Sequence, residues 1–259
     1  MTKVLFLGDT HGSIPHCAKA AKVAKRMGAD VIVQVGDWGM TWPEHPPRDR
    51  VKALSNALAQ SGVPMVFIDG NHECFDELER RGATTDAGRF VELAPGVTYA
   101  PRGFAWEWDG VRFLSLGGAF SVDIDPDPFC RPPWPGRVLG HSYWLQETIT
   151  YADVDRAITE GPVDIMITHD APELPDELRW FMEKNHYKLD GASRSNRVAI
   201  RSVMDVVKPK LLVHGHMHHR YNGRLGDTVV CGLGRDGDGR DSWVFIDTDK
   251  LDEHLKEVP

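Results

Sequence analysis

Residues 4–12 read Val4-Leu5-Phe6-Leu7-Gly8-Asp9-Thr10-His11-Gly12, and the fold prediction starts from this segment. An unbroken run of apolar residues is typical of a strand that is buried on both faces. The run ends at a glycine, and Asp9 and His11 follow at once. Side chains just beyond the carboxyl ends of parallel strands line the ligand site of an open α/β sheet. The segment therefore predicts a buried strand that carries two polar side chains to a functional edge.

The same pattern of an apolar run followed by a polar cluster recurs along the chain. The later runs are 31–33, 65–68, 165–167 and 211–213, and the clusters after them are Gly36-Asp37, Gly70-Asn71-His72, His169 and His216-Met217-His218. Apolar residues at helical spacing predict helices from about Ser13, between Pro47 and Ser61, and between Ser195 and Val207. This alternation predicts parallel strands joined by crossover helices in an α/β fold.

The middle of the chain has a different character. Asp109-Gly110 lies between strand-like runs at 104–108 and 111–116, and this dipeptide is a strong hairpin signal. A loop rich in proline and aromatic residues follows within 117–145, and further strands are expected at 228–231 and 243–246. Because the polar clusters resume beyond this loop, we predict a single domain over residues 1–259 with an insertion around 117–145.

Composition excludes several classes of protein. The net charge is -8, and no dense Lys/Arg run appears, which argues against general nucleic-acid binding. No apolar stretch is long enough to span a bilayer, and no signal-peptide pattern precedes the first strand. The four cysteines form no C-x-x-C pair, which favours reduced thiols. We expect a cytoplasmic protein with no membrane partner; its oligomeric state has no signal in the sequence.

The polar clusters together form a set of metal-ligand residue types. Three Asp or Asn oxygens and four imidazoles are expected to meet, with His72 beside them; the candidate ligands are Asp9, His11, Asp37, Asn71, His169, His216 and His218. Such ligands suit manganese, iron or zinc. The set exceeds the needs of one ion and suits two ions about 3.5–4 Å apart, a spacing used for in-line attack on phosphorus. An isolated D-x-H or a lone histidine would be weak evidence, but the ordered set is strong.

Several neighbouring residues have less specific interpretations. Glycines beside the ligands are expected to let the backbone turn sharply; these are Gly8, Gly36, Gly70 and Gly215. Asp170 could orient a ligand or be a simple loop carboxylate. Trp38, Trp42 and Trp144 could stack on a base, although loop aromatics more often pack beneath the loop, and His214 and His219 are expected to pack or face solvent.

The five blocks together resemble the calcineurin-like metallophosphoesterase superfamily. The blocks are Gly8-Asp9-Thr10-His11-Gly12, Gly36-Asp37, Gly70-Asn71-His72-Glu73, Thr168-His169 and Gly215-His216-Met217-His218. The last block is similar to that of small bacterial and phage-type phosphodiesterases. The resemblance implies a four-layer α-β-β-α sandwich of two mixed sheets flanked by helices, with a di-metal site at the carboxyl ends of the strands.

The resemblance also implies roles for individual residues. Asp9, His11 and His218 would hold one ion, Asn71, His169 and His216 the other, and Asp37 would bridge both. His72 would contact the phosphoryl oxygen and protonate the leaving group. The serine/threonine phosphatase branch has Asp-Arg-Gly where this chain has Trp38-Gly39-Met40, and His-Gly-Gly where it has His169-Asp170-Ala171. These departures argue against a protein phosphatase.

The hypothesis is a metal-dependent phosphoester hydrolase. We expect a phosphodiesterase for a small diester or cyclic nucleotide, with hydroxide bridging two divalent ions, Mn²⁺ before Fe or Zn, and with His72, Asn71 and Asp37 as catalytic residues. A phosphomonoesterase is the alternative; a nuclease or a non-catalytic scaffold of the same fold ranks lower. The loops near 38–50, 117–145 and 171–196 are expected to set the substrate, because loops vary on a shared scaffold.

Overall fold

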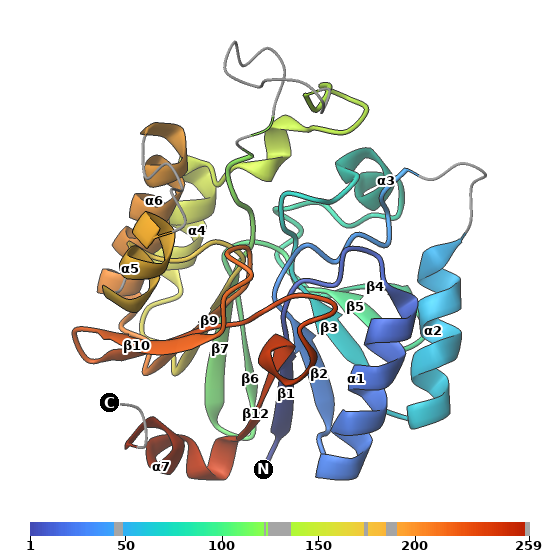
Figure 1. Ribbon diagram of the computed structural model, residues 1–259, viewed down its shortest axis with the longest axis horizontal. Coiled ribbons are helices and arrows are strands. Elements are labelled where there is room, and N and C mark those ends of the chain that lie inside the picture. Colours follow the sequence, from blue (N-terminus) through green and yellow to red (C-terminus); the bar gives the residue numbers. More distant parts are fainter. Residues whose placement is uncertain (44–48, 122, 124–135, 174–175, 185–190, 257–259) are drawn as a thin grey trace.

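The chain folds into two six-stranded sheets that pack face to face, with helices on both outer sides (Figure 1). This computed structural model describes residues 1–43, 49–121, 123, 136–173, 176–184 and 191–256. The first sheet has the order β12 (Trp243–Asp247), β1 (Lys3–Leu7), β2 (Val31–Gln34), β3 (Met65–Phe67), β5 (Val97–Tyr99), β4 (Val91–Ala94). The second has the order β10 (Tyr221–Leu225), β11 (Thr228–Gly232), β9 (Leu211–His214), β8 (Ile165–Thr168), β7 (Val111–Leu116), β6 (Phe104–Trp108).

The two sheets share one plan. Within each, the four central strands are parallel, and the strand at either edge is antiparallel to its neighbour. Parallel strands need long crossover connections, and helices supply most of them. The mixed character of both sheets confirms the predicted architecture.

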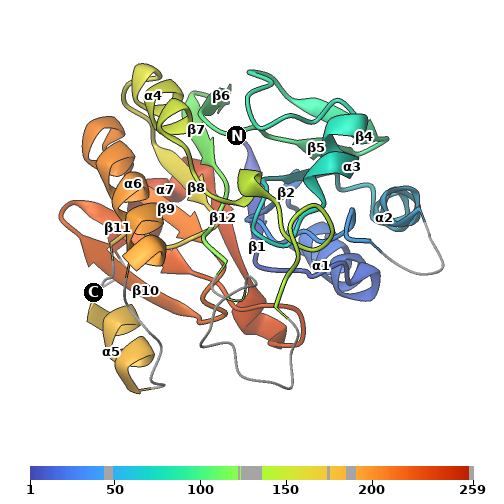
Figure 2. The same cartoon turned by 90° about the horizontal axis from the view of Figure 1, so that it is seen from above.

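Most of the helices form the two outer layers. The helices are α1 (Ile14–Met27), α2 (Arg50–Ser61), α3 (Phe75–Arg80), α4 (Tyr151–Thr159), α5 (Asp176–Lys184), α6 (Gly191–Val207) and α7 (Leu251–Lys256), with short 3-10 turns η1 (Leu145–Glu147), η2 (Gly239–Ser242) and η3 (Thr248–Lys250). Outside the two layers, α3 lies beyond the carboxyl ends of the strands and α7 lies at the opposite end (Figure 1). Seen from above, α1 and α2 lie beside the first sheet, and α4, α5 and α6 lie beside the second (Figure 2). The order of layers is therefore helix, sheet, sheet, helix, as predicted.

Side chains alternate between core layers along each central strand. In β1, Val4 and Phe6 enter the core between the sheets, whereas Leu5 and Leu7 pack under α1 and α2. In β8, Ile165 enters the core between the sheets and Met166 packs under the other helix layer. Both faces of these strands are buried, which explains why their sequences read as unbroken apolar runs.

The hairpin and helices predicted from sequence are present, with some shifted boundaries. Asp109 (φ 51°) and Gly110 (φ 81°) both adopt the left-handed conformation that a tight hairpin turn between β6 and β7 requires. The helix expected from residue 47 begins at Arg50, after an Asp49 side chain that accepts from the backbone N–H of Lys52 at 3.0 Å. The helix expected from residue 195 starts earlier, at Gly191.

Part of the predicted insertion lies outside the described residues, namely 122 and 124–135. The remainder, 136–145, runs back towards the carboxyl ends of the strands. Cys17, Cys74 and Cys231 are buried and form no disulfide, and Cys130 lies outside the described residues. Within the described ranges, no helix has the length and apolar character needed to cross a bilayer.

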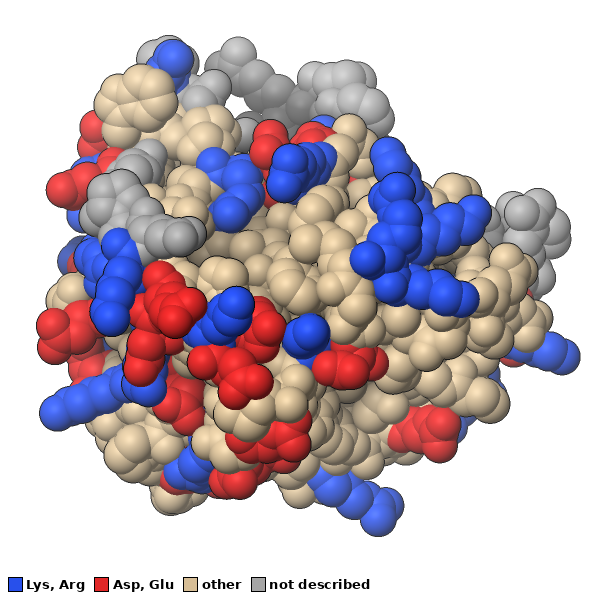
Figure 3. All heavy atoms as spheres, turned by 90° about the horizontal axis from the view of Figure 1, so that it is seen from below, with Lys and Arg blue, Asp and Glu red and all other residues tan. Residues whose placement is uncertain are grey.

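Charges of both signs share the face at the amino end of β1. Figure 3 views this face from below; a group of Lys and Arg lies on one side of it, and Asp and Glu interspersed with further Lys and Arg occupy the other. Nucleic-acid binders usually present a continuous basic face. The part of this face that the structure describes is not of that kind.

Truncation in the core between the sheets should destabilise the protein. Phe113 is fully buried there and stacks on Trp106, with ring centroids 5.5 Å apart. We expect Phe113→Ala to lower the free energy of unfolding by about 3–5 kcal/mol, measured by urea denaturation, because burial is lost and a cavity remains. Tyr151→Ala, at a side chain that is 92% exposed, should change it by less than about 0.5 kcal/mol. Equal losses would contradict this account of the core.

Candidate metal centre

The predicted ligands meet where the two sheets come together. Asp9, Asp37 and Asn71 follow β1, β2 and β3 of the first sheet. His169 follows β8 of the second sheet, and the His216-Met217-His218 segment follows β9. A direct hydrogen bond joins the two sets, because the backbone N–H of His216 donates to Asp9 Oδ1 at 3.0 Å. Both sheets therefore contribute to one site.

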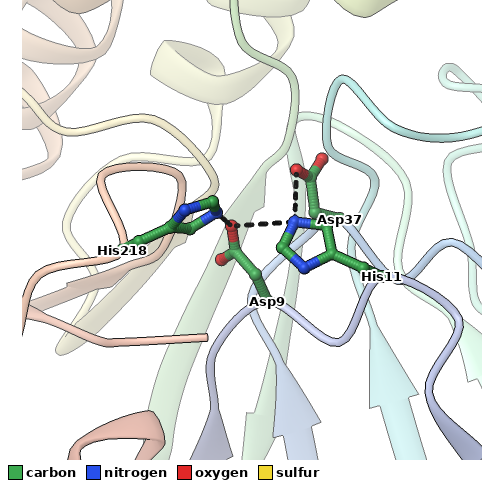
Figure 4. Close-up of side chains that lie close together, drawn as sticks. All are labelled: Asp9, His11, Asp37 and His218. Atoms are coloured by element: carbon green, nitrogen blue, oxygen red, sulfur yellow. Dashed lines mark ion pairs between the residues drawn. The ribbon is translucent and has the colours of Figure 1, made fainter. Parts of the chain in front are cut away.

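Four of the predicted ligands form a compact group (Figure 4). Atoms of Asp9, His11, Asp37 and His218 that could bind a cation all lie within 4.8 Å of one another. His218 Nε2 is 2.9 Å from Asp9 Oδ2, and His11 Nε2 is 3.6 Å from Asp37 Oδ2. Two carboxylates and two imidazoles thus point into the same small volume.

The other three predicted ligands adjoin this group on the far side of Asp37. His169 Nε2 lies 3.0 Å from Asp37 Oδ1 and 3.2 Å from Asn71 Oδ1. The ring of His216 meets that of His169, with centroids 5.1 Å apart. Asp37 therefore offers one oxygen to each half of the site, as a shared ligand would have to.

The ligand set fits divalent ions, because the remote nitrogens of two imidazoles are already engaged. His11 Nδ1 lies 2.7 Å from Asp236 Oδ1, and His169 Nδ1 lies 2.9 Å from the Val35 carbonyl oxygen. Such contacts fix the tautomer and leave Nε2 free for a metal, as is usual for metal-binding histidines. Mixed oxygen and imidazole donors suit manganese, iron and zinc.

Four predicted ligands have strained backbones. The φ angles of His11 (42°), Asp37 (51°), His216 (62°) and His218 (48°) all lie in the left-handed region. This conformation costs of order 1–3 kcal/mol for a residue with a side chain, and such strain clusters at functional sites. Here it is held by local hydrogen bonds, since the His11 N–H donates to the Asp37 carbonyl oxygen at 2.9 Å.

The glycines beside the ligands act mainly through close packing, which corrects part of the sequence interpretation. Of the four, Gly36 has a positive φ, 96°. At Gly70 a Cβ atom would come within 2.2 Å of the Asp37 nitrogen, and at Gly215 within 2.1 Å of Asp9 Oδ1. At Gly8 it would come within 1.9 Å of the Gly234 carbonyl oxygen. These positions require glycine because ligands and loops approach the backbone closely.

Glu73, the last residue of the Gly70-Asn71-His72-Glu73 block, holds the loop after β2. Its fully buried carboxylate accepts from the backbone N–H groups of Trp38 at 2.6 Å and Gly39 at 3.0 Å. Burial, with repulsion from Asp37, raises the pKa of Glu73 well above its usual value. The loop that carries Asp37 is thereby tied to the segment that carries Asn71.

Carboxylates and imidazoles shift one another's proton affinity in the metal-free protein. Burial alone would raise the pKa of Asp37, but the charges of His169 and His72 hold it well below the usual value. Burial opposes protonation of both His11 and His169, yet Asp37 raises their pKa values to about 9 and about 10. At neutral pH these two imidazoles therefore carry protons where cations would bind.

Metal binding should release protons. We expect about two protons per protein at pH 7, one each from His11 and His169, since Nε2 must be deprotonated to bind a cation. Apparent affinity should rise with pH up to about 10, the higher of the two pKa values, because protons then compete less. Calorimetric titration with Mn²⁺ in buffers of different ionisation enthalpy measures the number released. A pH-independent affinity without proton release would contradict the assignment.

His72 differs from the ligands in its surroundings. Its side chain is 37% exposed, its Nε2 is 4.0 Å from Asp37 Oδ2, and its ring packs against Trp42 with centroids 5.4 Å apart. The Arg137 guanidinium also lies over Trp42, 5.2 Å from the ring centroid. His72 thus borders the site from its open side.

Other residues singled out in the sequence mostly have packing roles. Trp38 is buried and stacks on Phe67, and Trp144 is buried. His214 is buried against Tyr221, and Asp170 accepts from Asn196 Nδ2 at 2.9 Å.

Sequence reasoning gave no role to three residues that contact predicted ligands, Asp236, Ser121 and Arg137. Asp236 lies in a run of alternating Gly and Asp after β11, which was a usable signal. Arg137 has no local motif around it.

Comparisons with known proteins give the family of the chain and agree with its fold. The sequence model described as calcineurin-like phosphoesterase matches residues 2–220. The chain belongs to this family. Solved structures of similar fold include TT1561 of Thermus thermophilus (TM-score 0.59, 15% identity, 94% of this chain and 93% of that chain). A dimetal phosphatase from Danio rerio is also similar (TM-score 0.52, 13% identity, 90% of this chain and 87% of that chain).

Two curated proteins are similar to this phosphoesterase-family chain in sequence. A lariat debranching enzyme of Entamoeba histolytica is 24% identical over 176 residues, which are 66% of this chain and 47% of that protein. A UDP-2,3-diacylglucosamine hydrolase of Sodalis glossinidius is 24% identical over 230 residues, 83% of this chain and 81% of that protein. The aligned part covers about half the length of the Entamoeba protein.

Proposed function

We propose that this family member is a two-metal phosphodiesterase that acts on small diesters, cyclic nucleotides among them. The observation that carries the proposal is the position of Asp37 between His11 and His169, with one carboxylate oxygen towards each. That position suits a ligand shared by two cations. The enzyme names of the two curated relatives support a hydrolytic or bond-cleaving role.

The ligands divide into two sets around Asp37. One ion would be held by Asp9, His11 and His218, the other by Asn71, His169 and His216, and Asp37 would reach both. Bound divalent ions supply positive charge and acidify water, which makes a nucleophile available near neutral pH. Manganese is the proposed metal, with iron and zinc compatible with the same donors.

His72 is proposed as the general acid. It lies beside the ligands without joining them, and its partial exposure leaves it accessible to a bound ester. Burial lowers the pKa of His72 and Asp37 opposes this shift, so the metal-free protein holds it mostly neutral at pH 7. To protonate the leaving group, His72 would have to act in its cationic form. An alkoxide that leaves poorly depends most on this protonation.

A diester is favoured over a monoester by the state of Arg137. A monoester dianion carries more charge than a diester and gains most from a free guanidinium. Four of the five N–H groups of the Arg137 guanidinium already have an acceptor within the protein, in Ser142, Ser121, Asn71 and Glu147. This arginine is therefore occupied, which supports a substrate of lower charge.

A substrate panel tests the proposal directly. Chelated protein should regain activity when Mn²⁺ is added, with Fe²⁺ and Zn²⁺ as comparisons, and should hydrolyse bis(nitrophenyl) phosphate faster than nitrophenyl phosphate. Faster monoester cleavage would favour a phosphomonoesterase. If no phosphoester, nucleic acids included, were cleaved with any metal, the chain would be a scaffold of the same fold.

Asp37→Ala should abolish turnover and paired metal binding together. Loss of the shared carboxylate leaves each half of the site without one oxygen, and we expect calorimetry to show no second ion at concentrations that saturate the native protein. Asp109→Ala, in the hairpin turn far from the site, is the matched control and should bind two ions. Native turnover by Asp37→Ala would show that the shared-ligand geometry is unimportant.

His72→Ala should retain both ions and lose rate selectively. We expect turnover of alkyl diesters to fall by about 10²–10⁴-fold, and of nitrophenyl diesters much less, because a good leaving group needs little protonation. Rates on both esters, together with metal content by mass spectrometry, check this. An equal loss of turnover rate on both diesters would show that His72 is not the general acid.

A further inference from the structure

The side-chain amide of Asn71 can face the metal centre in two ways. Its oxygen can bind a cation, whereas its NH₂ group, which results from a half-turn of the amide, cannot. Carboxylate ligands such as Asp37 have no such ambiguity. In the structure the oxygen faces inward, with Oδ1 3.2 Å from His169 Nε2, and something must favour that orientation.

Ser121 receives the other end of the amide. Asn71 Nδ2 donates to Ser121 Oγ at 3.1 Å, and both residues are almost fully buried. A hydroxyl can ordinarily donate or accept, so by itself it would tolerate either orientation of the amide. The surroundings of Ser121 therefore decide which orientation is favoured.

Glu147 and Arg137 make the Ser121 hydroxyl an acceptor towards Asn71. The single hydroxyl hydrogen is donated to Glu147 Oε2, and Arg137 Nη1 donates to Oγ at 2.6 Å. With Glu147 ionised, no hydrogen remains for Asn71. A flipped amide would place its oxygen against the Ser121 oxygen, and a buried pair of acceptors without a donor between them is unfavourable.

Arg137 is itself held rigidly in this cluster. Nη2 donates to the Asn71 backbone carbonyl at 2.8 Å and to Glu147 Oε1 at 2.5 Å, and Nε donates to the Ser142 carbonyl. The guanidinium thus connects the backbone and the side-chain partner of Asn71. It has no nitrogen without an acceptor, which distinguishes a supporting role from direct substrate binding.

We propose that Ser121, Arg137 and Glu147 are positioning residues that hold the Asn71 amide with its oxygen towards the metal centre. This deepens the proposed function and rests on it for the identity of Asn71 as a ligand. It also gives a role to two residues of the insertion predicted around 117–145, Ser121 and Arg137, and to Glu147 just after it: they support the site from outside the scaffold strands.

Metal affinity in single variants gives the first test. In a calorimetric titration with Mn²⁺, Ser121→Ala should weaken binding of the second ion about 10–100-fold and leave the affinity for the first ion unchanged. This is the usual effect of removing a hydrogen-bond partner of a metal ligand. Glu147→Gln keeps the side-chain shape and should also weaken binding of the second ion. Ser142→Ala is the matched control, since that hydroxyl accepts from the Val138 N–H in the same loop. Native affinity in Ser121→Ala would overturn the proposal.

A second test, in the background of Asn71→Asp, distinguishes an effect of Ser121 on the orientation of the Asn71 amide from an effect on packing. A carboxylate presents oxygen in either orientation, so adding Ser121→Ala to Asn71→Asp should cost far less affinity than adding it to the native chain. Equal losses in both backgrounds would show that Ser121 merely packs, and would overturn the proposal. Circular dichroism establishes that each variant is folded.

The proposed function can fail separately. If two ions bind and the variants behave as expected but no phosphoester is cleaved, the phosphodiesterase proposal falls and the positioning role remains. If the native protein binds no Mn²⁺ at all, the positioning role falls as well, because no ligand oxygen then needs orientation.

Discussion

Two buried carboxylates at the junction of the sheets constrain everything around them. Asp9 and Asp37 are almost fully buried, and unpaired charges there would be very costly. Neighbouring imidazoles and backbone N–H donors offset this cost. His218 lies 2.9 Å from Asp9, and the His72 N–H donates to Asp37 Oδ1 at 2.8 Å. In the metal-free protein the protons on His11 and His169 offset these two charges, and bound cations would take the place of those protons.

The same constraint explains the local irregularities of the backbone. The ligand loops must bring several short side chains into one small volume, so four of them adopt left-handed conformations and neighbouring positions admit no Cβ. A second buried ion pair supports the third strand end, where Arg102 Nε donates to Asp69 Oδ2 at 2.8 Å. Asp69 immediately precedes the Gly70-Asn71-His72 segment, so this pair anchors the loop that bears both a proposed ligand and the proposed acid.

The central strands and the connecting segments contribute different parts of the site. The central strands of both sheets place the ligands, and their positions depend on core packing that many phosphoesterases of this family could share. Trp42, Arg137 and Ser121 come from connecting segments and surround Asn71 and His72. Selectivity among phosphoesters is therefore expected to depend on these segments, since loops vary more readily than the elements they connect.

The sequence by itself determined the strand ends and the residue types upon them. Apolar runs such as 4–7 and the polar residues that follow them are local patterns, because burial on both faces leaves an unbroken run and the ligands come directly after it. Short elements such as α3, β4 and β5 left no such pattern. The reason for glycine at positions 70 and 215 was also not local, since it depends on Asp37 and Asp9 approaching from other strands.

Tertiary structure alone decided how these pieces combine. It placed strand ends from two different sheets at one centre and set Asp37 between two imidazoles. It also brought Ser121 and Arg137, 50 and 66 residues from Asn71 in sequence, into hydrogen-bond contact with it. Such contacts form between side chains that folding brings together, and no spacing along the chain encodes which atom of an amide will face inward.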